Sequence, residues 1–328
     1  MVRDDVLSVL ENKRGEVVSG GAIAKELGVS RTAVWKAVSS LKDSGFAIES
    51  VRNGGYRLLA SNDLLTPAGI QMFLQSQTIG KKILVLEQVD STNTRVKQEF
   101  SAEEEGFVLV SHSQTGGRGR MGRAFVSDAG KGIYMTILLK PCLTLQRVNF
   151  LTLAAAVAVC RAAEDCCGFS PGIKWVNDLY MEEKKLCGIL TEASIEGESG
   201  AVSYAVVGIG VNVDFCGASL PEDVQRIAGD FASFAKTMPL RNQLCASILS
   251  HFEVLYQALL AGNDSAVLHP YRERLFFLGK PITVLEFGRA YEAVALSVND
   301  SGNLLVRRKD GGIETLVSGE ISIKLQKS

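Results

Sequence analysis

The pattern of apolar and polar positions changes twice along the chain, and its first part covers residues 1–62. Apolar residues recur at helical spacing over 6–10 and again over 33–41. A shorter helix between them ends at Gly28, and the short turn that follows has helix-turn-helix spacing. Two β-rich runs then flank 53–55, Asn-Gly-Gly, which is a strong hairpin signal. This part of the sequence therefore predicts a winged helix-turn-helix domain over 1–62.

The second part, residues 67–275, mixes predicted strands and helices without the regular alternation of a doubly wound fold. Thr66 and Pro67 are suited to cap and start its first helix. Long apolar helices are predicted over 148–163 and 240–260. Because several strands follow one another directly, we expect an α+β domain with a mixed or antiparallel sheet. Strands are predicted over 82–89, 107–113, 132–140, 173–176, 185–193 and 202–213.

The third part, residues 276–328, contains closely spaced short strands separated by Gly, Asn and Asp turns. These strands are predicted over 282–287, 291–298, 303–308, 312–317 and 321–325. The spacing is typical of a small SH3-like β-barrel. The whole chain is therefore expected to be an α+β multidomain protein with a winged helix-turn-helix, a central mixed-sheet domain and a C-terminal barrel.

Composition narrows the class of protein. The chain of 328 residues is 46% hydrophobic and 22% charged, which is typical of a soluble globular protein with two or three domains. The longest apolar run, 148–160, is shorter than the roughly 20 residues that a membrane span needs. The amino terminus has no signal-peptide pattern, and the seven cysteines have no paired metal-ligand spacing. We therefore expect a cytoplasmic protein with reduced thiols and no membrane partner.

Because the net charge is −1, nucleic-acid binding would need a local basic surface. Residues 1–60 contain 9 Lys and Arg against 7 Asp and Glu, so their local net charge is +2. The basic residues concentrate on the third helix and the hairpin, and in a winged helix the third helix enters the major groove. Winged helices also serve as protein-docking modules, and this alternative stays open. The residues predicted to contact DNA are Arg31, Thr32, Trp35, Lys36 and Arg52.

Residues 115–123, Thr-Gly-Gly-Arg-Gly-Arg-Met-Gly-Arg, are the most informative stretch for chemistry. Four glycines alternate with three arginines, and no acidic residue intervenes. Glycine lets the backbone approach a ligand closely, and arginine offers a fork of donors that suits phosphates and carboxylates. Neither a P-loop nor the strand-to-helix context of a dinucleotide-binding loop is present. The stretch predicts an anion-binding loop that becomes ordered when its anion binds.

Two further clusters carry polar groups that could act on a ligand. Ser91-Thr92-Asn93 stands between a strand and a helix, where it can cap the helix or hold a small polar ligand. Asp178 and Lys185 come together if 174–190 forms a hairpin around an Asn-Asp turn. The acid can hold Mg²⁺ or a ribose hydroxyl, and the lysine can neutralise a carboxylate or phosphate. An ordinary helix cap and an exposed hairpin with a surface ion pair are the competing interpretations.

Glycines also interrupt the apolar strand that precedes Asn212. Gly208 and Gly210 within that strand imply close approach of a ligand or of another backbone. Asn212 would then be a polar point in an apolar pocket. A tightly packed core strand explains the same pattern equally well.

In this order, the motifs resemble the biotin–protein ligases, and the N-terminal winged helix makes the chain similar to the bifunctional ligase/repressors of that family. The resemblance spans nearly the whole chain. The motifs that carry it are Ser91-Thr92-Asn93, Gly117-Arg118-Gly119-Arg120-Met121-Gly122-Arg123, Lys174-Trp175-Val176-Asn177-Asp178-Leu179-Tyr180, Lys185-Leu186-Cys187-Gly188-Ile189-Leu190 and Gly208-Ile209-Gly210-Val211-Asn212.

The resemblance implies an enzyme that uses ATP to activate biotin as biotinyl-5′-AMP. The enzyme would then transfer biotin to a lysine of a biotin carboxyl carrier protein domain. The resemblance also implies a biotin-responsive repressor of biotin synthesis or uptake genes. That repressor would bind operator DNA and form a homodimer when biotinyl-5′-AMP is bound.

Site residues are likewise implied by the resemblance. Lys185, Arg118 and Arg120 would be catalytic. No dedicated metal site is expected, since Mg²⁺ would arrive with ATP and have Asp178 as its protein contact. The residues implied for biotin are Ser91, Thr92, Asn93, Gln114, Gly117, Arg118, Arg120, Lys185, Gly188 and Asn212. Those implied for ATP and the adenylate are Arg118, Arg120, Arg123, Phe125, Asn177, Asp178 and Lys324.

The chain departs from the family pattern at three positions. Val176 stands where the family usually has Pro, Phe125 where it has Trp and Lys324 where it has Arg. Lys324 keeps the charge but loses the planar fork of arginine. Three alternatives stay open: a ligase whose winged helix does not bind DNA, a lipoate-type acyl ligase, and a biotin- or lipoate-binding regulator without ligation.

Overall fold

The computed structural model describes residues 2–196, 201–286, 289–317 and 319–323. The chain divides into two compact units. The first contains residues 1–75 together with 239–247, and the second contains 76–238 together with 248–328. The second unit therefore holds both the central sheet and the C-terminal strands. The three-domain boundaries expected from the sequence stay a prediction.

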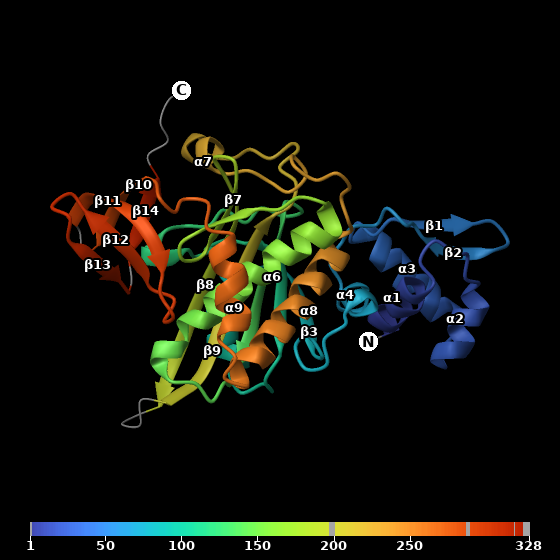
Figure 1. Ribbon diagram of the computed structural model, residues 1–328. Helices are drawn as coiled ribbons and strands as arrows, with labels where there is room; N and C mark the ends of the chain where they lie inside the picture. The colour runs from blue at the N-terminus through green and yellow to red at the C-terminus, as the bar shows by residue number, and fades with distance from the viewer. Residues whose placement is uncertain (1, 197–200, 287–288, 318, 324–328) are drawn as a thin grey trace. The chain divides into compact units, whose positions relative to one another are not determined.

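The first unit has the predicted winged helix-turn-helix (Figure 1). Its elements are α1 (Val2–Asn12), α2 (Gly20–Leu27), α3 (Arg31–Asp43), β1 (Ile48–Val51) and β2 (Gly55–Leu58). Ser19 and Ser30 cap α2 and α3 by accepting from the backbone N–H groups of Ala22 and Ala33. Gly28 ends α2 with a φ of 66°, which is the left-handed conformation predicted from its position.

Residues 61–66, the linker between the hairpin and the next helix, are held in place within the first unit. Thr66 caps α4 (Pro67–Phe73), because its Oγ1 accepts from the Gly69 N–H at 2.9 Å. Asp63 pairs with Arg241 at 2.7 Å, and Asn242 donates to the Leu64 carbonyl at 2.9 Å. The linker is therefore ordered by residues that lie far away in sequence, which local composition does not reveal.

The second unit is built on a seven-stranded sheet in the order β3-β4-β5-β9-β8-β7-β6. Only β3 and β4 are parallel, and every other neighbouring pair is antiparallel. The mixed sheet expected from the sequence is confirmed. Its strands are β3 (Ile83–Val89), β4 (Val108–Gln114), β5 (Gly132–Leu139), β6 (Gly172–Lys174), β7 (Asp178–Met181), β8 (Lys184–Glu196) and β9 (Ala201–Asn212).

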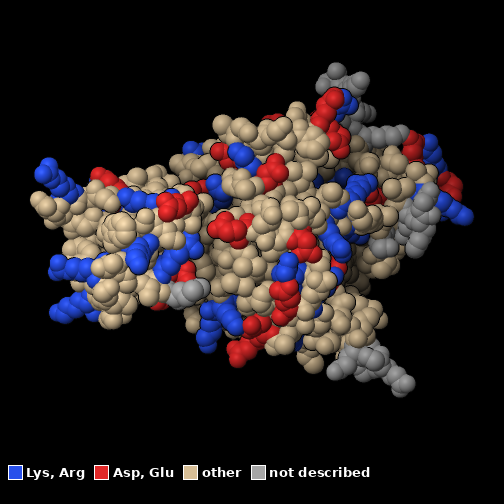
Figure 2. Space-filling view, turned by 180° about the vertical axis from the view of Figure 1, so that it is seen from behind, with Lys and Arg blue, Asp and Glu red and all other residues tan. Residues whose placement is uncertain are grey.

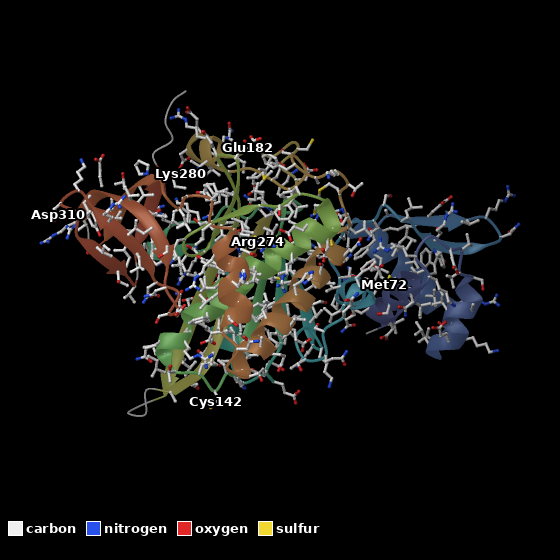
Figure 3. The ribbon with its side chains drawn as sticks, in the orientation of Figure 1. Met72, Cys142, Glu182, Arg274, Lys280 and Asp310 are labelled. Carbon is white, nitrogen blue, oxygen red and sulfur yellow. The ribbon has the colours of Figure 1, made fainter. Side chains whose placement is uncertain are left out.

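Helices cover this sheet (Figure 1). They are α5 (Thr92–Arg95), which continues as a π-helical turn (Val96–Phe100), α6 (Asn149–Cys167), α7 (Glu222–Ile227), α8 (Arg241–Leu260) and α9 (Ser265–Glu273); short 3-10 turns lie at Arg120–Gly122 and Leu145–Arg147. Helix α6 is buried on nearly all sides, because it packs on strands β7, β8 and β9 while α9 packs on it. Arg274, which follows α9, reaches back to both carboxylate oxygens of Glu164 on α6 at 2.9 Å (Figure 3).

The single hairpin predicted over 174–190 is wrong in one respect. The chain makes two turns there, and Asp178 begins the separate strand β7 instead of lying in the turn. The second turn contains Glu182 at a φ of 54°. Its sequence, Met-Glu-Glu-Lys, has none of the Gly, Pro or Asn residues that normally signal a turn, so no local pattern predicts it.

The C-terminal strands, predicted to form a small SH3-like barrel, are a five-stranded antiparallel sheet in the order β13-β12-β11-β10-β14. They are β10 (Pro281–Glu286), β11 (Arg289–Val298), β12 (Leu304–Arg308), β13 (Ile313–Leu316) and β14 (Glu320–Ile323). One turn of this sheet contacts the central domain, since Trp175 donates its indole N–H to the Gly302 carbonyl at 3.1 Å. Arg272 of α9 contacts the same turn through Asp300 at 2.7 Å.

Each of the seven cysteines, all of them among the described residues, lies outside any disulfide. They are Cys142, Cys160, Cys166, Cys167, Cys187, Cys216 and Cys245. Burial raises the pKa of Cys167 and of Cys245 to about 12, which keeps both thiols protonated at neutral pH. Within the described part of the chain, every helix is too short or too polar to cross a membrane.

Candidate active site and DNA-binding surface

Glycines on β8 and β9 leave a shallow trench on one face of the central sheet. Gly210 stands opposite Tyr134 of β5 and Gly188 of β8. Gly208, two residues away on the same face, stands opposite Thr136 and Leu190. A Cβ on Gly208 or on Gly210 would meet other side chains at 2.4 Å and 2.6 Å. The predicted close approach is therefore present, although side chains make it and not another backbone.

The Asn93 side chain lies directly against Gly208, at one end of the trench. Its Oδ1 accepts from Thr136 Oγ1 at 2.7 Å, and its Nδ2 donates to the Leu190 carbonyl at 3.0 Å. The same Nδ2 donates to Glu192 Oε2 at 2.9 Å. Asn93 is buried, and both its amide oxygen and its amide nitrogen are engaged within the protein. It thus forms part of the fixed floor of the site.

Thr92 and Gln114 extend this neutral floor. Gln114 Oε1 accepts from the Thr92 backbone N–H at 2.8 Å and from Thr92 Oγ1 at 3.1 Å. Gln114 Nε2 donates to Ser127 Oγ at 2.8 Å. Ser91 caps α5 by accepting from the Thr94 N–H at 3.5 Å. The floor therefore consists of uncharged groups already paired with one another.

The glycine- and arginine-rich loop folds back over the other end of the trench. The Gly119 N–H donates to the Arg123 carbonyl at 2.7 Å, and the Phe125 N–H donates to the Gly117 carbonyl at 2.9 Å. The Phe125 ring lies over Gly210 and Gly188, edge-on to the Tyr134 ring at 6.4 Å. Ordering of this loop by an anion stays a prediction, since the structure gives the loop one conformation.

The arginines of this loop reach partners in other elements. Arg120 donates to Asn177 Oδ1 at 3.3 Å, and Arg123 pairs with Glu320 of the C-terminal sheet at 2.5 Å. Burial lowers the pKa of Arg120, while the charges of Asp178 and Glu320 oppose that shift. A desolvated cation of this kind is stabilised when an anion binds beside it.

Lys185 and Asp178 meet as the sequence predicted, with Nζ and Oδ1 2.8 Å apart. Asn177 donates its amide to Asp178 Oδ1 at 2.9 Å and to the Ile189 carbonyl at 2.8 Å, which fixes the start of β7. Asn212 donates to the carbonyls of Lys185 at 3.2 Å and Gly229 at 2.9 Å. Its amide nitrogen therefore holds the backbone around Lys185 and is not turned toward a ligand.

Sequence reasoning missed Lys174 and Glu320 as site residues. Lys174 lies over the Tyr180 ring, with Nζ 5.4 Å from the ring centroid, and burial lowers its pKa. It adjoins the Trp175–Val176 peptide bond, which is cis where the family usually has Pro. Lys174 stands inside a motif that the sequence singled out, so its position was a usable signal. Glu320 enters from a strand about 140 positions further on than Asp178, and only the tertiary fold brings it here.

These groups enclose a cavity of about 220 Å³. Gly117 is buried within the loop and does not line the cavity, and Lys324 lies outside the described residues. Val224, Ile227 and Ala228, from α7 and the residue after it, form an apolar wall that the sequence did not predict. The predicted residues that line the cavity are Ser91, Thr92, Asn93, Gln114, Arg118, Arg120, Arg123, Phe125, Asn177, Asp178, Lys185, Gly188 and Asn212.

The residues predicted to contact DNA are all exposed in the first unit. They are Arg31, Thr32, Trp35, Lys36 and Arg52. Trp35 is 59% exposed, which is unusual for a tryptophan of a folded domain. A concave surface between α3 and the hairpin is lined by Arg31, Thr32 and Trp35, and basic side chains stand out around the winged helix in Figure 2. Arg57 differs from these residues, because it pairs with Glu49 at 2.6 Å.

Comparison with known proteins assigns each part of the chain. Residues 85–212 match the Biotin/lipoate A/B protein ligase family, residues 2–57 an HTH domain and residues 277–324 the Biotin protein ligase C terminal domain. The chain is 31% identical to the Bifunctional ligase/repressor BirA of Bacillus subtilis (strain 168), with 98% of each chain covered. The chain belongs to the bifunctional ligase/repressor family. Another member, the Bifunctional ligase/repressor BirA of Escherichia coli (strain K12), is 25% identical over 97% of this chain and 96% of its own.

A solved member of the wider ligase family has the same catalytic fold. The Biotin protein ligase from Aquifex aeolicus in complex with biotin and ATP is 27% identical and has a TM-score of 0.64. The match covers 74% of this chain and 99% of that structure. Family membership, the α+β fold and the helix-turn-helix expected from the sequence are thereby confirmed.

Proposed function

We propose that this protein is an ATP-dependent biotin–protein ligase that also represses transcription in response to biotin. The observation that best supports this proposal is a single cavity with a neutral floor and a cationic end. The Lys185–Asp178 ion pair lies where the two ends meet. An acid with a neutral, largely apolar body and a single carboxylate fits such a cavity. The related Aquifex aeolicus enzyme is in complex with biotin and ATP, and relatives over the full chain are named ligase/repressors.

The neutral floor is assigned to the body of biotin. Ser91, Thr92 and Gln114 offer hydroxyl and amide groups to the polar ring of biotin, while the apolar wall covers its hydrocarbon parts. The chain of biotin then runs toward Lys185, whose ammonium neutralises the carboxylate. This places the reacting carboxylate at the boundary between the two ends of the cavity.

The cationic end is assigned to the phosphates of ATP. A carboxylate oxygen of biotin attacks the α-phosphorus in line, the bond to the pyrophosphate oxygen breaks, and biotinyl-5′-AMP and pyrophosphate form. Negative charge builds on the phosphate oxygens, so cations held in place before the reaction lower its barrier. The described cations that line this end are Arg118, Arg120, Arg123, Lys174 and Lys185.

Magnesium fits this site only as a companion of ATP. Asp178 is the carboxylate nearest the reacting groups, and it is already paired with Lys185 at 2.8 Å. One paired carboxylate does not make a protein metal site, so phosphate oxygens and water would supply the other ligands. When bound there, Mg²⁺ neutralises phosphate charge.

The second half-reaction transfers biotin to the carrier domain. The neutral amine of a carrier lysine attacks the carbonyl carbon of the mixed anhydride, the bond from that carbon to the phosphate oxygen breaks, and AMP leaves. The nitrogen loses its proton as the amide forms. Arg120 and Arg123 would hold the adenylate phosphate until the amine arrives.

A mass measurement tests the ligase proposal. The protein is incubated with ATP, Mg²⁺, biotin and a carrier domain, and the mass of the carrier is recorded. A gain of one biotin on the carrier lysine is expected. The family profile includes lipoate ligases, so lipoate replaces biotin in a parallel reaction. Modification with lipoate and not with biotin would reject biotin as the substrate.

The winged helix is assigned to operator DNA. Helix α3 would enter the major groove with Thr32, Trp35 and Lys36 facing the bases and phosphates, and Arg52 would reach the flanking backbone. Binding of biotinyl-5′-AMP is expected to favour a homodimer, which matches two half-sites. Biotin status thereby controls repression.

Gel-shift titration tests the repressor. Affinity should fall with salt, and Lys36→Ala or Arg52→Ala should weaken binding and reduce the slope on log salt by about 1 for each lost phosphate contact. Sedimentation with and without biotinyl-5′-AMP measures whether the protein forms a dimer. If the adenylate changes neither operator affinity nor oligomeric state, the protein is a ligase whose winged helix has another role.

A further inference from the structure

Glu192 on β8 is the second acceptor for the Asn93 amide. Its Oε2 receives an Asn93 N–H at 2.9 Å, and its Oε1 pairs with Lys97 Nζ at 2.5 Å. Glu192 lies two residues beyond Leu190 along β8, and the Leu190 carbonyl accepts from the same Asn93 amide. Glu192 does not line the cavity, and no motif of the sequence includes it.

The Asn93 side chain depends on partners from three strands. Thr136 of β5 holds its oxygen, Leu190 and Glu192 of β8 hold its nitrogen, and Gly208 of β9 leaves the space in which it lies. Without the Glu192 carboxylate, one N–H of a buried amide would lose its acceptor, which is costly enough to make the side chain move.

Helix α5 and the π-helical turn that continues it, Val96–Phe100, form one short helical segment. A helical segment this short is marginal on its own, so its position is set by the side chains that attach it to the sheet. Asn93 is the second residue of that turn, directly after Thr92 and the N-cap Ser91, which both line the cavity. The attachment of Asn93 therefore sets where these two residues stand, together with the hydrogen bonds from Thr92 to Gln114.

We propose that Glu192 is a positioning residue for the biotin site. Through Asn93 it sets the position of Ser91 and Thr92, without itself reaching the ligand. The inference rests on the proposed function, because it takes the neutral end of the cavity as the biotin end. It predicts that Glu192 affects recognition of biotin and leaves recognition of ATP unchanged, since the cationic end has other attachments.

Steady-state kinetics of adenylate formation test the proposal. Glu192→Leu is expected to raise KM for biotin about tenfold, with kcat and KM for ATP within about twofold of the unsubstituted protein. Glu192→Gln should restore KM for biotin, because its side-chain oxygen can accept the same Asn93 N–H. Lys97→Met is the matched control: it removes the half-exposed ion pair but keeps the Glu192–Asn93 bond, so KM for biotin should stay unchanged.

Thr136→Val tests the same anchor from the opposite strand and is available if Glu192→Leu does not fold. It removes the donor to Asn93 Oδ1 and should raise KM for biotin with KM for ATP unchanged. The inference is overturned if Glu192→Leu folds and keeps KM for biotin, if Glu192→Gln is as impaired as Glu192→Leu, or if KM for ATP rises in parallel. Absence of biotin transfer by the unsubstituted protein would instead reject the proposed function.

Discussion

At one end of the cavity, Asn93 and Gln114 make their hydrogen bonds within the protein and carry no charge, whereas the other end gathers cations against two carboxylates. At the neutral end, these hydrogen bonds hold the side chains in place without any ligand. At the charged end, burial lowers the pKa of Arg120 and Lys174, which means that their charged forms lack some of the solvation they would have in water. The cations of the charged end are Arg118, Arg120, Arg123, Lys174 and Lys185, and its carboxylates are Asp178 and Glu320.

This difference indicates separate roles for the two ends. The neutral end is complete before a ligand arrives, so it can select a shape and a hydrogen-bonding pattern. The charged end gains most when an anion replaces the missing solvation, so it responds to charge that develops during a reaction. Changes at the two ends should therefore have different consequences, and four experiments separate them.

The largest effect is expected from Lys185→Ala at the charged end. Loss of this cation should slow pyrophosphate release in the first half-reaction by about 100-fold or more, by analogy with the loss of one transition-state donor. Biotin binding, measured by calorimetry, should be largely kept. Lys184→Ala is the matched control, because the Lys184 ammonium donates to the carbonyls of Gln225 and Arg226 and does not line the cavity. Undiminished pyrophosphate release by Lys185→Ala would remove its assigned role.

The next largest effect is expected on the free energy of unfolding in urea, where Gly208→Ala is compared with Gly210→Ala. The new methyl group of Gly208→Ala would meet the firmly bonded amide of Asn93, and a loss of about 1–3 kcal/mol in the free energy of unfolding is expected. Gly210→Ala would meet the ring of Phe125, which belongs to a loop and can move aside at lower cost. Equal losses of unfolding free energy in the two variants would show that the Phe125 ring is held over Gly210 as firmly as the Asn93 amide is held over Gly208.

Arg120→Gly should release the reaction intermediate. Arg120 is partly buried at the charged end and donates to Asn177, so its removal opens the enclosure around the adenylate phosphate. Free biotinyl-5′-AMP, measured after filtration, should rise about tenfold, corresponding to about 1.4 kcal/mol. Arg120→Lys keeps the charge and should release less. An unchanged ratio of bound to free adenylate in Arg120→Gly would contradict the enclosure.

The smallest effect is a pH dependence that comes from Lys174. Burial lowers the pKa of this lysine below its ordinary value of 10.5, so the free protein loses this charge at a lower pH than an exposed lysine would. The kcat/KM for ATP should then fall by about threefold as pH rises through that lowered pKa. In Lys174→Arg the fall should shift to higher pH, because arginine keeps its proton. KM for biotin should show no such change if the neutral end is independent.

Much of the site was predictable because its groups lie in short local motifs. Ser91–Asn93, the loop at 115–123 and the Asp178–Lys185 pair all meet at the cavity; spacing indicated the Asp178–Lys185 pair, and the family resemblance implied that the clusters share one site. The hydrogen bonds that these groups make within the protein were not predictable. Asn93 and Asn212 each use their amide nitrogen to hold backbone or side-chain groups, and a sequence motif cannot distinguish such a group from a ligand contact.

The sequence by itself determined the elements whose signals are local. Helical periodicity, the caps Ser19 and Ser30 and the turn residue Gly28 specified the winged helix, and runs of β-branched residues specified most strands. Only the tertiary structure decided which distant residues meet. It brought Glu192 to Asn93 and Glu320 to Arg123, because sheet register and domain packing set those distances. It also separated a neutral end of the cavity from a charged one, since burial and pairing belong to the folded chain as a whole.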